Sequence, residues 1–395
     1  MSTNDMPVYI SSNANRFYCA TEVTYGQVPA VTSDNRIPAV KLSTKQQLEV
    51  TSRRDKTGSR TFAGLPSGGR RRTTFDLNTL LTTWAGGPGA PSYGPLFQAA
   101  LGEGALISAG GTVGAGSNNS TLAFAGPHGL TAGQAVAYLG EIRFVTAVVD
   151  AQTVQLNAPL TVAPVPGSST GPTATYFPST NLPTATVFDY WDPASAVHRI
   201  LCGAAVDQMN VKINGDYHEF AFSGVAQELV DSASFSSGIG QLTAFPPEPA
   251  LGTFDYSIVP GNLGQVWLGN VPGQFFTLTD AQLSLSNNLD VRAHEFGSSL
   301  PRAVSPGVRA VTLEFELYQM DDVATQGLYQ AAKQQSPISA MIQLGQQPNQ
   351  LFAGYLKSLI PQVPEYDDGE ARLKWRFRGS RAQGTVDDEI TVAFG

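Results

Sequence analysis

The stretch LSLSNNLDV at residues 283–291 decides the fold, because the chain carries a version of it twice. The earlier version is LSTKQQLEV at residues 42–50, and the two align without a gap. Three further blocks recur in the same order: residues 75–77 with 315–317, residues 96–100 with 328–332, and residues 220–224 with 375–379. Four blocks in one order indicate an internal duplication, in which one structural unit occurs twice.

The third and fourth blocks lie much further apart in the first unit than in the second, which indicates an insertion. The charged residues of this stretch are sparse: Glu103, Glu141, Arg143 and Asp150. We therefore expect a discontinuous unit one (residues 1–102 and 184–240), an inserted outward-facing β domain (the insertion, residues 103–183) and a unit two (residues 241–395).

Alternation of apolar and polar residues with a period of two dominates both units and predicts strands. Leu373, Trp375 and Phe377, for example, alternate with basic residues. We expect a mainly β fold of two tandem β-sandwich or half-barrel units, each with one packed helix, and a small all-β insertion. The predicted core of the repeat comprises Leu48, Phe75, Phe222, Leu289, Phe315, Trp375 and Phe377.

Each unit contains one convincing helix. In unit two, Asp321 or Asp322 can cap the N-terminus of a helix that continues to Gln335, and the Ser-Pro pair at 336–337 ends it. The corresponding helix of unit one ends at Gly102, a residue type that is common directly after helix C-termini.

The charge balance argues against a protein that grips nucleic acid. The chain has 24 Lys and Arg against 32 Asp and Glu, a net charge of −8, and only 14% charged residues. A basic surface that neutralises phosphates is therefore not expected. Low charge combined with 42% hydrophobic residues indicates that neighbouring subunits cover much of the surface, as in an assembly.

Residues that carry catalysis or bind metals occur only in weak patterns. Two cysteines, Cys19 and Cys202, supply neither a disulfide framework nor a Cys-rich zinc site. The stretch GSSTG at residues 167–171 matches a nucleophile elbow but lacks the strand-to-helix context. We expect no enzyme, no cofactor and no metal. The sequence shows neither a secretory signal nor a long apolar run, so we expect a protein made in the cytoplasm.

Seven basic residues lie between the first two blocks of unit one, in a segment with several glycines: Arg53, Arg54, Lys56, Arg60, Arg70, Arg71 and Arg72. This composition predicts a long hairpin or extended arm, the first arm (residues 53–72). Two interpretations stay open, a solvated basic loop or an arm that docks on the acidic surface of a neighbouring subunit. The second arm (residues 292–312) has similar length and fewer charges, and its candidate contact residues are Arg292, His294, Arg302 and Arg309.

The stretches AQLSLSNNL at residues 281–289 and PGVRAVTL at residues 306–313 resemble tail tube (major tail) proteins of long-tailed bacteriophages. In that family a strand with an Asn-Asn pair precedes a long loop, and the next strand opens with a Gly-x-Arg pattern. The helix at 328–335 and the strand at 373–379 also match the family. Unit one matches more loosely, with Gln46-Gln47 and Gly69-Arg70 at the corresponding positions.

The resemblance implies rings of six tube units whose inner strands close into a β-barrel, stacked into a tube that conducts DNA. A chain with two such units would form a ring from three subunits, with its arms contacting the adjacent ring. The implied partners are further copies of the chain, tape-measure and tail-tip or terminator proteins, and viral DNA that passes without specific binding. The implied location is the virion tail, assembled in the host bacterial cytoplasm without membrane insertion.

Two alternatives stay open at this point. The chain could be another ring protein of the tail, such as the distal tail or terminator protein. It could also be a carbohydrate-binding β-sandwich protein whose site is lined by Tyr138, Phe144, Tyr176 or Phe177. A separate question concerns the basic residues between Arg372 and Arg378, which do not suit a lumen that conducts DNA and face either a neighbour or the outside.

Overall fold

The computed structural model describes residues 9–49, 56, 58–61, 64, 69–84, 89–252, 256–269, 271 and 273–395. The protein is 44% strand and 7% helix, which confirms the expected mainly β fold. The helices of the described part are α1 (Gly94–Leu101), α2 (Val323–Gln334) and the short 3-10 helices η1 (Ser33–Asn35) and η2 (Ile239–Gln241). Within these same residues, no helix has the length and apolar character needed to span a membrane.

The strands fall into three groups along the chain. Unit one contains β1 (Asn15–Thr21), β2 (Arg36–Ile37), β3 (Ala39–Leu48), β4 (Arg71–Leu80), β11 (Ala185–Trp191), β12 (Arg199–Ile213), β13 (Glu219–Ala226) and β14 (Glu228–Asp231). The insertion contains β5 (Leu106–Ser108), β6 (Thr121–Ala123), β7 (Ala135–Tyr138), β8 (Glu141–Val148), β9 (Thr153–Leu156) and β10 (Thr173–Tyr176). Unit two contains β15 (Gly264–Leu268), β16 (Phe275–Phe276), β17 (Leu278–Ser286), β18 (Asp290–Val291), β19 (Val304–Ser305), β20 (Ala310–Tyr318), β21 (Ile338–Leu344), β22 (Phe352–Ile360), β23 (Glu365–Asp367), β24 (Lys374–Ala382) and β25 (Thr391–Phe394).

The same order of strand pairing occurs in both units. In unit one, β1 pairs with β2 and β11, β11 with β12, β12 with β13 and β14, β13 with β4, and β4 with β3. In unit two, β15 pairs with β16 and β21, β21 with β22, β22 with β24 and β25, β24 with β20, and β20 with β17. Each of these pairings in unit one has one counterpart in unit two. The exact domain boundaries remain predictions.

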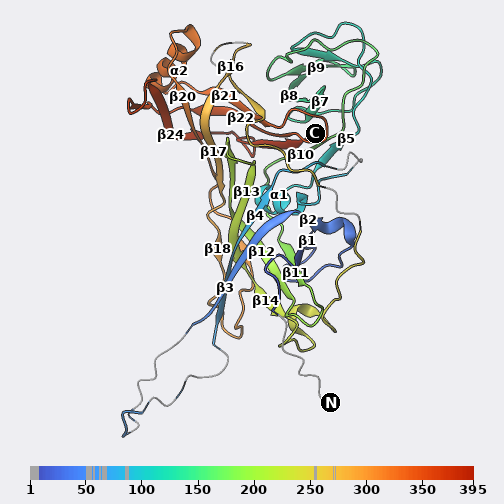
Figure 1. Cartoon of the computed structure of the whole chain (residues 1–395), viewed down its shortest axis with the longest axis vertical. Coiled ribbons are helices and arrows are strands. Elements are labelled where there is room, and N and C mark those ends of the chain that lie inside the picture. The colour runs from blue at the N-terminus through green and yellow to red at the C-terminus, as the bar shows by residue number, and fades with distance from the viewer. Residues whose placement is uncertain are drawn as a thin grey trace.

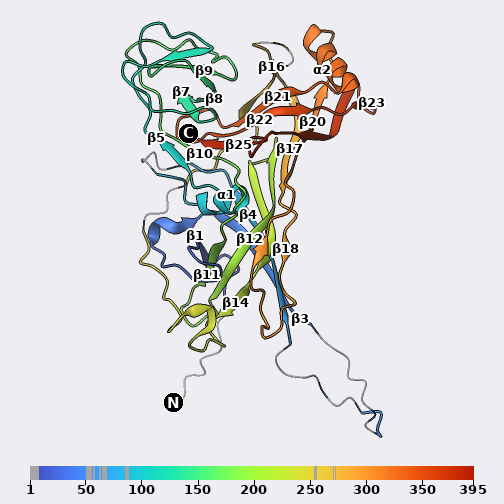
Figure 2. The same ribbon diagram turned by 180° about the vertical axis from the view of Figure 1, so that it is seen from behind.

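The long strands of both units run side by side through the middle of the molecule (Figure 1). The β3–β4 hairpin leaves this sheet and extends away from the body, and Figure 2 shows it from behind. The insertion lies at the opposite end, beside the C-terminus, while α2 lies at the far side of the same end. The described residues of the first arm and the insertion are therefore at opposite ends of the long axis.

Helix α1 lies in the core between the two units. Its Phe97 is fully buried and packs edge-on against Phe222 of unit one and Phe394 of unit two, with ring centroids 5.2 and 5.1 Å apart. The helix ends at Gly102, as predicted, where φ is +121°. Glycine adopts this positive φ without the steric strain that a side chain introduces. The aromatic cluster joins the units into one hydrophobic core.

Helix α2 begins where the sequence predicted. The side chain of Asp322 is the N-cap and accepts a hydrogen bond of 2.6 Å from the backbone N–H of Thr325. This bond satisfies one of the free N–H groups of the first turn. At the other end Gln335 caps the helix with a left-handed backbone.

The residues predicted as the core of the repeat lie in two different environments. Buried in the main apolar cluster are Phe75, Phe222, Phe315, Trp375 and Phe377, whereas Leu289 is half-buried. The prediction is wrong for Leu48, whose side chain is 60% exposed. Leu48 ends β3, an edge strand that continues beyond the body of unit one, and its side chain faces solvent there.

The insertion has a four-stranded sheet of its own in the order β6-β9-β8-β7, with a separate apolar cluster that includes Leu122, Phe124 and Val154. Its last strand, β10, instead pairs with β25 of unit two. Of the four aromatic residues considered for a glycan site, Tyr138, Phe144 and Tyr176 are buried and Phe177 is half-buried.

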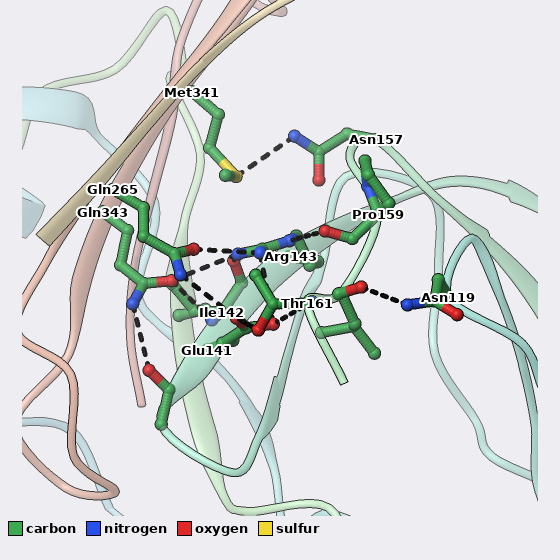
Figure 3. Close-up of polar contacts among 12 residues, drawn as sticks. Asn119, Glu141, Ile142, Arg143, Asn157, Pro159, Thr161, Gln265, Met341 and Gln343 are labelled. Carbon is green, nitrogen blue, oxygen red and sulfur yellow. Dashed lines mark hydrogen bonds and ion pairs between the residues drawn. The ribbon is translucent and has the colours of Figure 1, made fainter. Parts of the chain in front are cut away.

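A buried arginine fixes the insertion to unit two (Figure 3). Arg143 on β8 is fully buried, and its guanidinium donates to Gln343 on β21 at 3.2 Å and to Gln265 on β15 at 3.0 Å. It also donates to the carbonyl oxygen of Pro159 and forms an ion pair with Glu141 at 3.3 Å. Burial lowers the pKa of Arg143 to about 10. This network makes the insertion a docked part of the molecule.

Candidate assembly interface

The two units meet along one strand pair. Strand β12 of unit one and β17 of unit two form an antiparallel ladder from Gln208 opposite Ser286 to Ile213 opposite Ala281. This pair merges the strands into one sheet in the order β3-β4-β13-β12-β17-β20-β24, which β22 and β23 continue. The ladder is thus an example, within a single chain, of how one unit contacts the next.

Asn287 closes this junction. It is 1% exposed, and its side-chain amide donates to the carbonyl oxygens of Ala100, in the last turn of α1, and of Val206, both at 2.9 Å. Its backbone N–H donates to the carbonyl oxygen of Asp207 at 2.8 Å, and the Asp207 carboxylate accepts the N–H of Leu289 at 2.9 Å. The sequence marked the Asn-Asn pair but gave no indication of these partners.

The second arm covers the end of the unit-one sheet. The backbone N–H of Arg71 donates to the carbonyl oxygen of Ser299 at 2.8 Å, and the guanidinium of Arg70 donates to the carbonyl oxygen of His294 at 3.2 Å. A cavity of about 240 Å³ remains between the two, lined by Ala226 on one side and Leu289 on the other. The end of unit one is therefore largely filled by a segment of unit two.

The predicted residues of the first arm are distributed between its base and its outer part. Arg53 and Arg54 lie outside the described residues, while Lys56, Arg60 and Arg72 are exposed. At the base, Arg71 forms an ion pair of 2.6 Å with Glu228. Burial raises the pKa of Glu228, and Arg71 partly opposes that shift. Arg70 and Arg71 thus hold the base of the arm to the body of the same chain.

The predicted residues of the second arm all have partners within the chain. Glu295 forms ion pairs with Arg292 and with Arg302, the latter at 3.6 Å. His294 lies 3.9 Å from the carboxylate of Glu49, at the base of the first arm.

Arg309, at the end of the second arm, makes the most extensive contacts of this set. Its guanidinium binds Asp387 at 3.2 Å and Glu389 at 2.6 Å, and donates to the carbonyl oxygen of Ser179 at 2.5 Å. These contacts join the second arm, the end of the insertion at Ser179 and the loop before β25.

Each end of the merged sheet has an unpaired edge. Among the described residues, β3 pairs only with β4, and β23 pairs only with β24. Apolar side chains are exposed at both edges: Val40 at 61%, Val363 at 46% and Tyr366 at 58%. Unpaired N–H and C=O groups beside exposed apolar side chains form a template for pairing with another chain.

The basic residues of β24 are paired across the solvent face of the sheet. Arg376 forms ion pairs with Glu316 on β20 at 3.0 Å and with Asp367 on β23 at 2.5 Å. Arg378 lies 3.6 Å from Glu365. Sequence alternation put these residues on one face but could not show that carboxylates of the neighbouring strands compensate their charge.

The part of the chain that the structure describes contains no cluster of three or more His, Cys, Asp or Glu that could hold a metal ion. Cys19 and Cys202 are both buried, and burial raises the pKa of the Cys202 thiol to about 12. A neutral buried thiol is a poor nucleophile.

No family model matches this chain, and no curated protein matches it.

Proposed function

We propose that the chain is a structural subunit of a phage tail tube, in which three chains close one ring. The observation that carries this proposal is the contrast between one paired junction and two unpaired edges. Strand β12 of unit one pairs with β17 of unit two. Strand β3 is the counterpart of β17, and β23, which continues β22 along β24, lies at the position that β12 has in unit one.

Repeating the junction between chains brings β23 of one chain to β3 of the next. Such a head-to-tail contact uses two different surfaces and forms a ring when the rotation closes. Closure removes both unpaired edges and covers their apolar side chains. The duplicated topology gives two equivalent units per chain, so the six units that the family resemblance implies require three chains.

The solvent face of the merged sheet has the character that a DNA conduit needs. Binding of DNA depends on Lys and Arg that neutralise phosphates and release counterions. Here Arg376 and Arg378 of β24 already have carboxylate partners on neighbouring strands. We assign this face to the lumen, where DNA passes without being held.

The remaining parts have roles that follow from their positions in this ring. The described residues of the first arm include exposed Lys56 and Arg60, and we assign this arm to the contact with the adjacent ring of the tube. The insertion lies at the other end of the chain and is assigned to the outside. In this function the partners are further copies of the chain, tape-measure and tail-tip or terminator proteins, in a virion tail assembled in the bacterial cytoplasm.

Negative-stain electron microscopy of the purified chain, with rotational analysis of end-on views, tests the proposal. We expect rings or tubes with three-fold symmetry and a pseudo-six-fold inner wall. Concentrated particles that stay single after seeding with tail tips contradict a tube subunit. The number of copies per virion separates the alternatives, because a distal tail or terminator protein forms one ring and a tube protein forms many.

A further inference from the structure

We propose that the insertion covers an apolar sheet face of unit two and thereby keeps that face from binding further copies of the chain. The face belongs to the sheet of β16, β15, β21, β22 and β25, and it points away from the main apolar cluster. We call it the outer face of unit two. This inference goes beyond the proposed ring and does not depend on it.

Alternation along the strands shows that this sheet is buried on both sides. Successive residues of a strand point to opposite faces of a sheet. On β21, Ile342 lies in the main apolar cluster, whereas Met341 lies in a separate cluster together with residues of the insertion. On β22, Phe352 and Ala353 are divided in the same way. The insertion therefore buries a second face that unit two presents.

A row of large side chains crosses the outer face of unit two. Phe275 on β16 lies opposite Trp267, Trp267 lies opposite Met341, and Met341 lies opposite Tyr355. Within the chain, Trp267 is 7% exposed and Met341 is fully buried. Side chains at facing positions of neighbouring strands touch, so these four form one continuous patch. A continuous apolar patch of this kind is an interaction surface when it is uncovered.

The insertion contacts both ends of this row. The ring of Phe144 on β8 stacks on the ring of Tyr355, with centroids 5.3 Å apart and an interplanar angle of 19°. The guanidinium carbon of Arg143 lies 5.3 Å from the ring centroid of Phe275. Strand β8 thus lies across the apolar row.

The adjacent row of the outer face is polar and orients the insertion (Figure 3). Gln265 lies opposite Gln343, and both side chains accept hydrogen bonds from Arg143. Gln343 also accepts the backbone N–H of Ile142 at 2.9 Å and donates to the carbonyl oxygen of Gly140 at 3.0 Å. Buried polar groups that all have partners specify one arrangement of the elements that carry them. The turn between β7 and β8 is therefore held in a single position on unit two.

Unit one has a corresponding apolar face, which other segments cover. Tyr18 on β1 and the residues Phe188 and Tyr190 on β11 lie in a cluster of their own. Side chains that pack on this cluster include Val28, from the segment before β2, and Phe245, from the segment after β14. Since both units have the same order of strand pairing, the insertion takes the place in unit two that these segments take in unit one.

Deletion of residues 111–170, with Gly110 joined to Gly171, tests the proposal. The cut points are adjacent, because the backbone N–H of Thr170 donates to the carbonyl oxygen of Gly111 at 2.9 Å. Strands β5 and β10 remain, β10 still pairs with β25, and every described residue of the main apolar cluster lies outside the deleted segment. We expect a chain that folds by circular dichroism, binds several-fold more of the dye ANS than the full-length chain, and forms irregular aggregates.

Two double variants of the deleted chain separate an uncovered face from a misfolded chain. Trp267→Thr/Met341→Thr replaces the centre of the apolar row by a residue that suits an exposed strand position. We expect dye binding and aggregation to return towards the level of the full-length chain. Val266→Thr/Ile342→Thr changes the facing pair one position along the same strands, on the side of the main apolar cluster, and is the control without rescue.

The outcomes separate this inference from the proposed function. A deleted chain that folds and binds no more dye than the full-length chain overturns the cover. A deleted chain that does not fold also overturns it, because the insertion is then part of the folding unit. Aggregation that Trp267→Thr/Met341→Thr leaves unchanged shows that another surface is responsible and overturns it as well. Dye binding per chain does not require rings, so a full-length chain without rings contradicts the proposed function alone.

A variant of the full-length chain tests the orienting role of Arg143. Arg143→Ala leaves Gln265 and Gln343 without their shared donor, so hydrogen exchange across β21 and the turn between β7 and β8 becomes several-fold faster. Gln155→Ala, at an exposed position of β9, is the control and leaves exchange unchanged. Unchanged exchange in Arg143→Ala overturns the orienting role.

Discussion

Units one and two have the same order of strand pairing but differ in what covers them. In unit one, β17 pairs with the edge of β12, and the second arm covers the end of the sheet. Unit two presents the corresponding strand edge uncovered. The comparison teaches that one contact, used once within the chain, is available for use between chains. It also identifies matched pairs of residues, in which one member lies at the β12–β17 junction and the other lies in the corresponding part of the other unit.

Substitution in the two helices gives the largest expected effect. Phe97 of α1 is fully buried between the units, so Phe97→Ala lowers the free energy of unfolding by about 4 kcal/mol through lost burial and a cavity. Its counterpart Tyr329 in α2 is only half-buried beside Trp375, and Tyr329→Ala costs about 1 kcal/mol. Urea unfolding followed by tryptophan fluorescence measures both. Equal losses contradict the view that only α1 lies between two units.

The next effect concerns Asn287, directly after β17, and its counterpart Gln46 in β3. Asn287→Ala leaves the carbonyl oxygens of Ala100 and Val206 without their donor, which costs about 3 kcal/mol. Its counterpart Gln46 is exposed and, among the described residues, its side chain donates to Thr73 alone, so Gln46→Ala costs about 0.5 kcal/mol in the isolated chain. The same unfolding measurement distinguishes them.

The yield of rings gives a further test of the comparison between Asn287 and Gln46. In the proposed ring Gln46 occupies the position of Asn287 at the contact between chains, so Gln46→Ala reduces the yield of rings although the chain is stable. Normal ring yield from Gln46→Ala shows that the two junctions differ in their polar contacts.

Much of the fold was predictable, because repetition and period-two alternation are properties of the sequence itself. The helix boundaries at Asp322 and Gly102 followed from local capping chemistry. The interface was less predictable, since its determinants come from residues that are distant in sequence. The partners of Asn287 and the carboxylates around Arg376 meet only through the order of strands in the sheet. Leu48 was misassigned because alternation does not show where an edge strand leaves the core.

A smaller effect of pH on stability is expected at Glu248, in the part of unit two that precedes β15. Glu248 binds Arg16 in a bidentate ion pair and accepts a bond of 3.0 Å from Tyr18. Burial raises the pKa of Glu248, but the hydrogen bonds from Arg16 and Tyr18 outweigh it and lower the pKa below its ordinary 4.5. The stabilisation is therefore present above that value and is lost as the pH falls through the lowered pKa.

Thermal unfolding between about pH 6 and pH 3 measures this dependence. Glu248→Gln removes the acid-dependent part, so its melting temperature falls less on acidification than that of the unmodified chain. Glu314→Gln, at an exposed position of β20, is the control and retains the original profile. A profile of Glu248→Gln that matches the unmodified chain shows that this ion pair does not anchor the start of unit two to unit one.

The smallest effect concerns the solvent face, where the units differ most in charge. Unit two carries Arg376 between Glu316 and Asp367, whereas the corresponding residue of unit one is Ala221. The double variant Glu316→Gln/Asp367→Asn frees the guanidinium. One additional phosphate contact steepens the dependence of the logarithm of DNA affinity on that of salt concentration by about 1.

Removing two carboxylates also changes the net charge, so the control removes two from unit one. Asp76→Asn/Glu219→Gln makes the same change in charge on strands β4 and β13 without releasing a paired arginine. Fluorescence anisotropy with a short duplex at several salt concentrations compares the variants. A steeper slope only in unit two shows that the ion pairs keep the arginines from binding phosphate. Equal slopes show that net charge alone governs the affinity of this face for DNA. In that case the ion pairs stabilise the sheet and do not control phosphate binding.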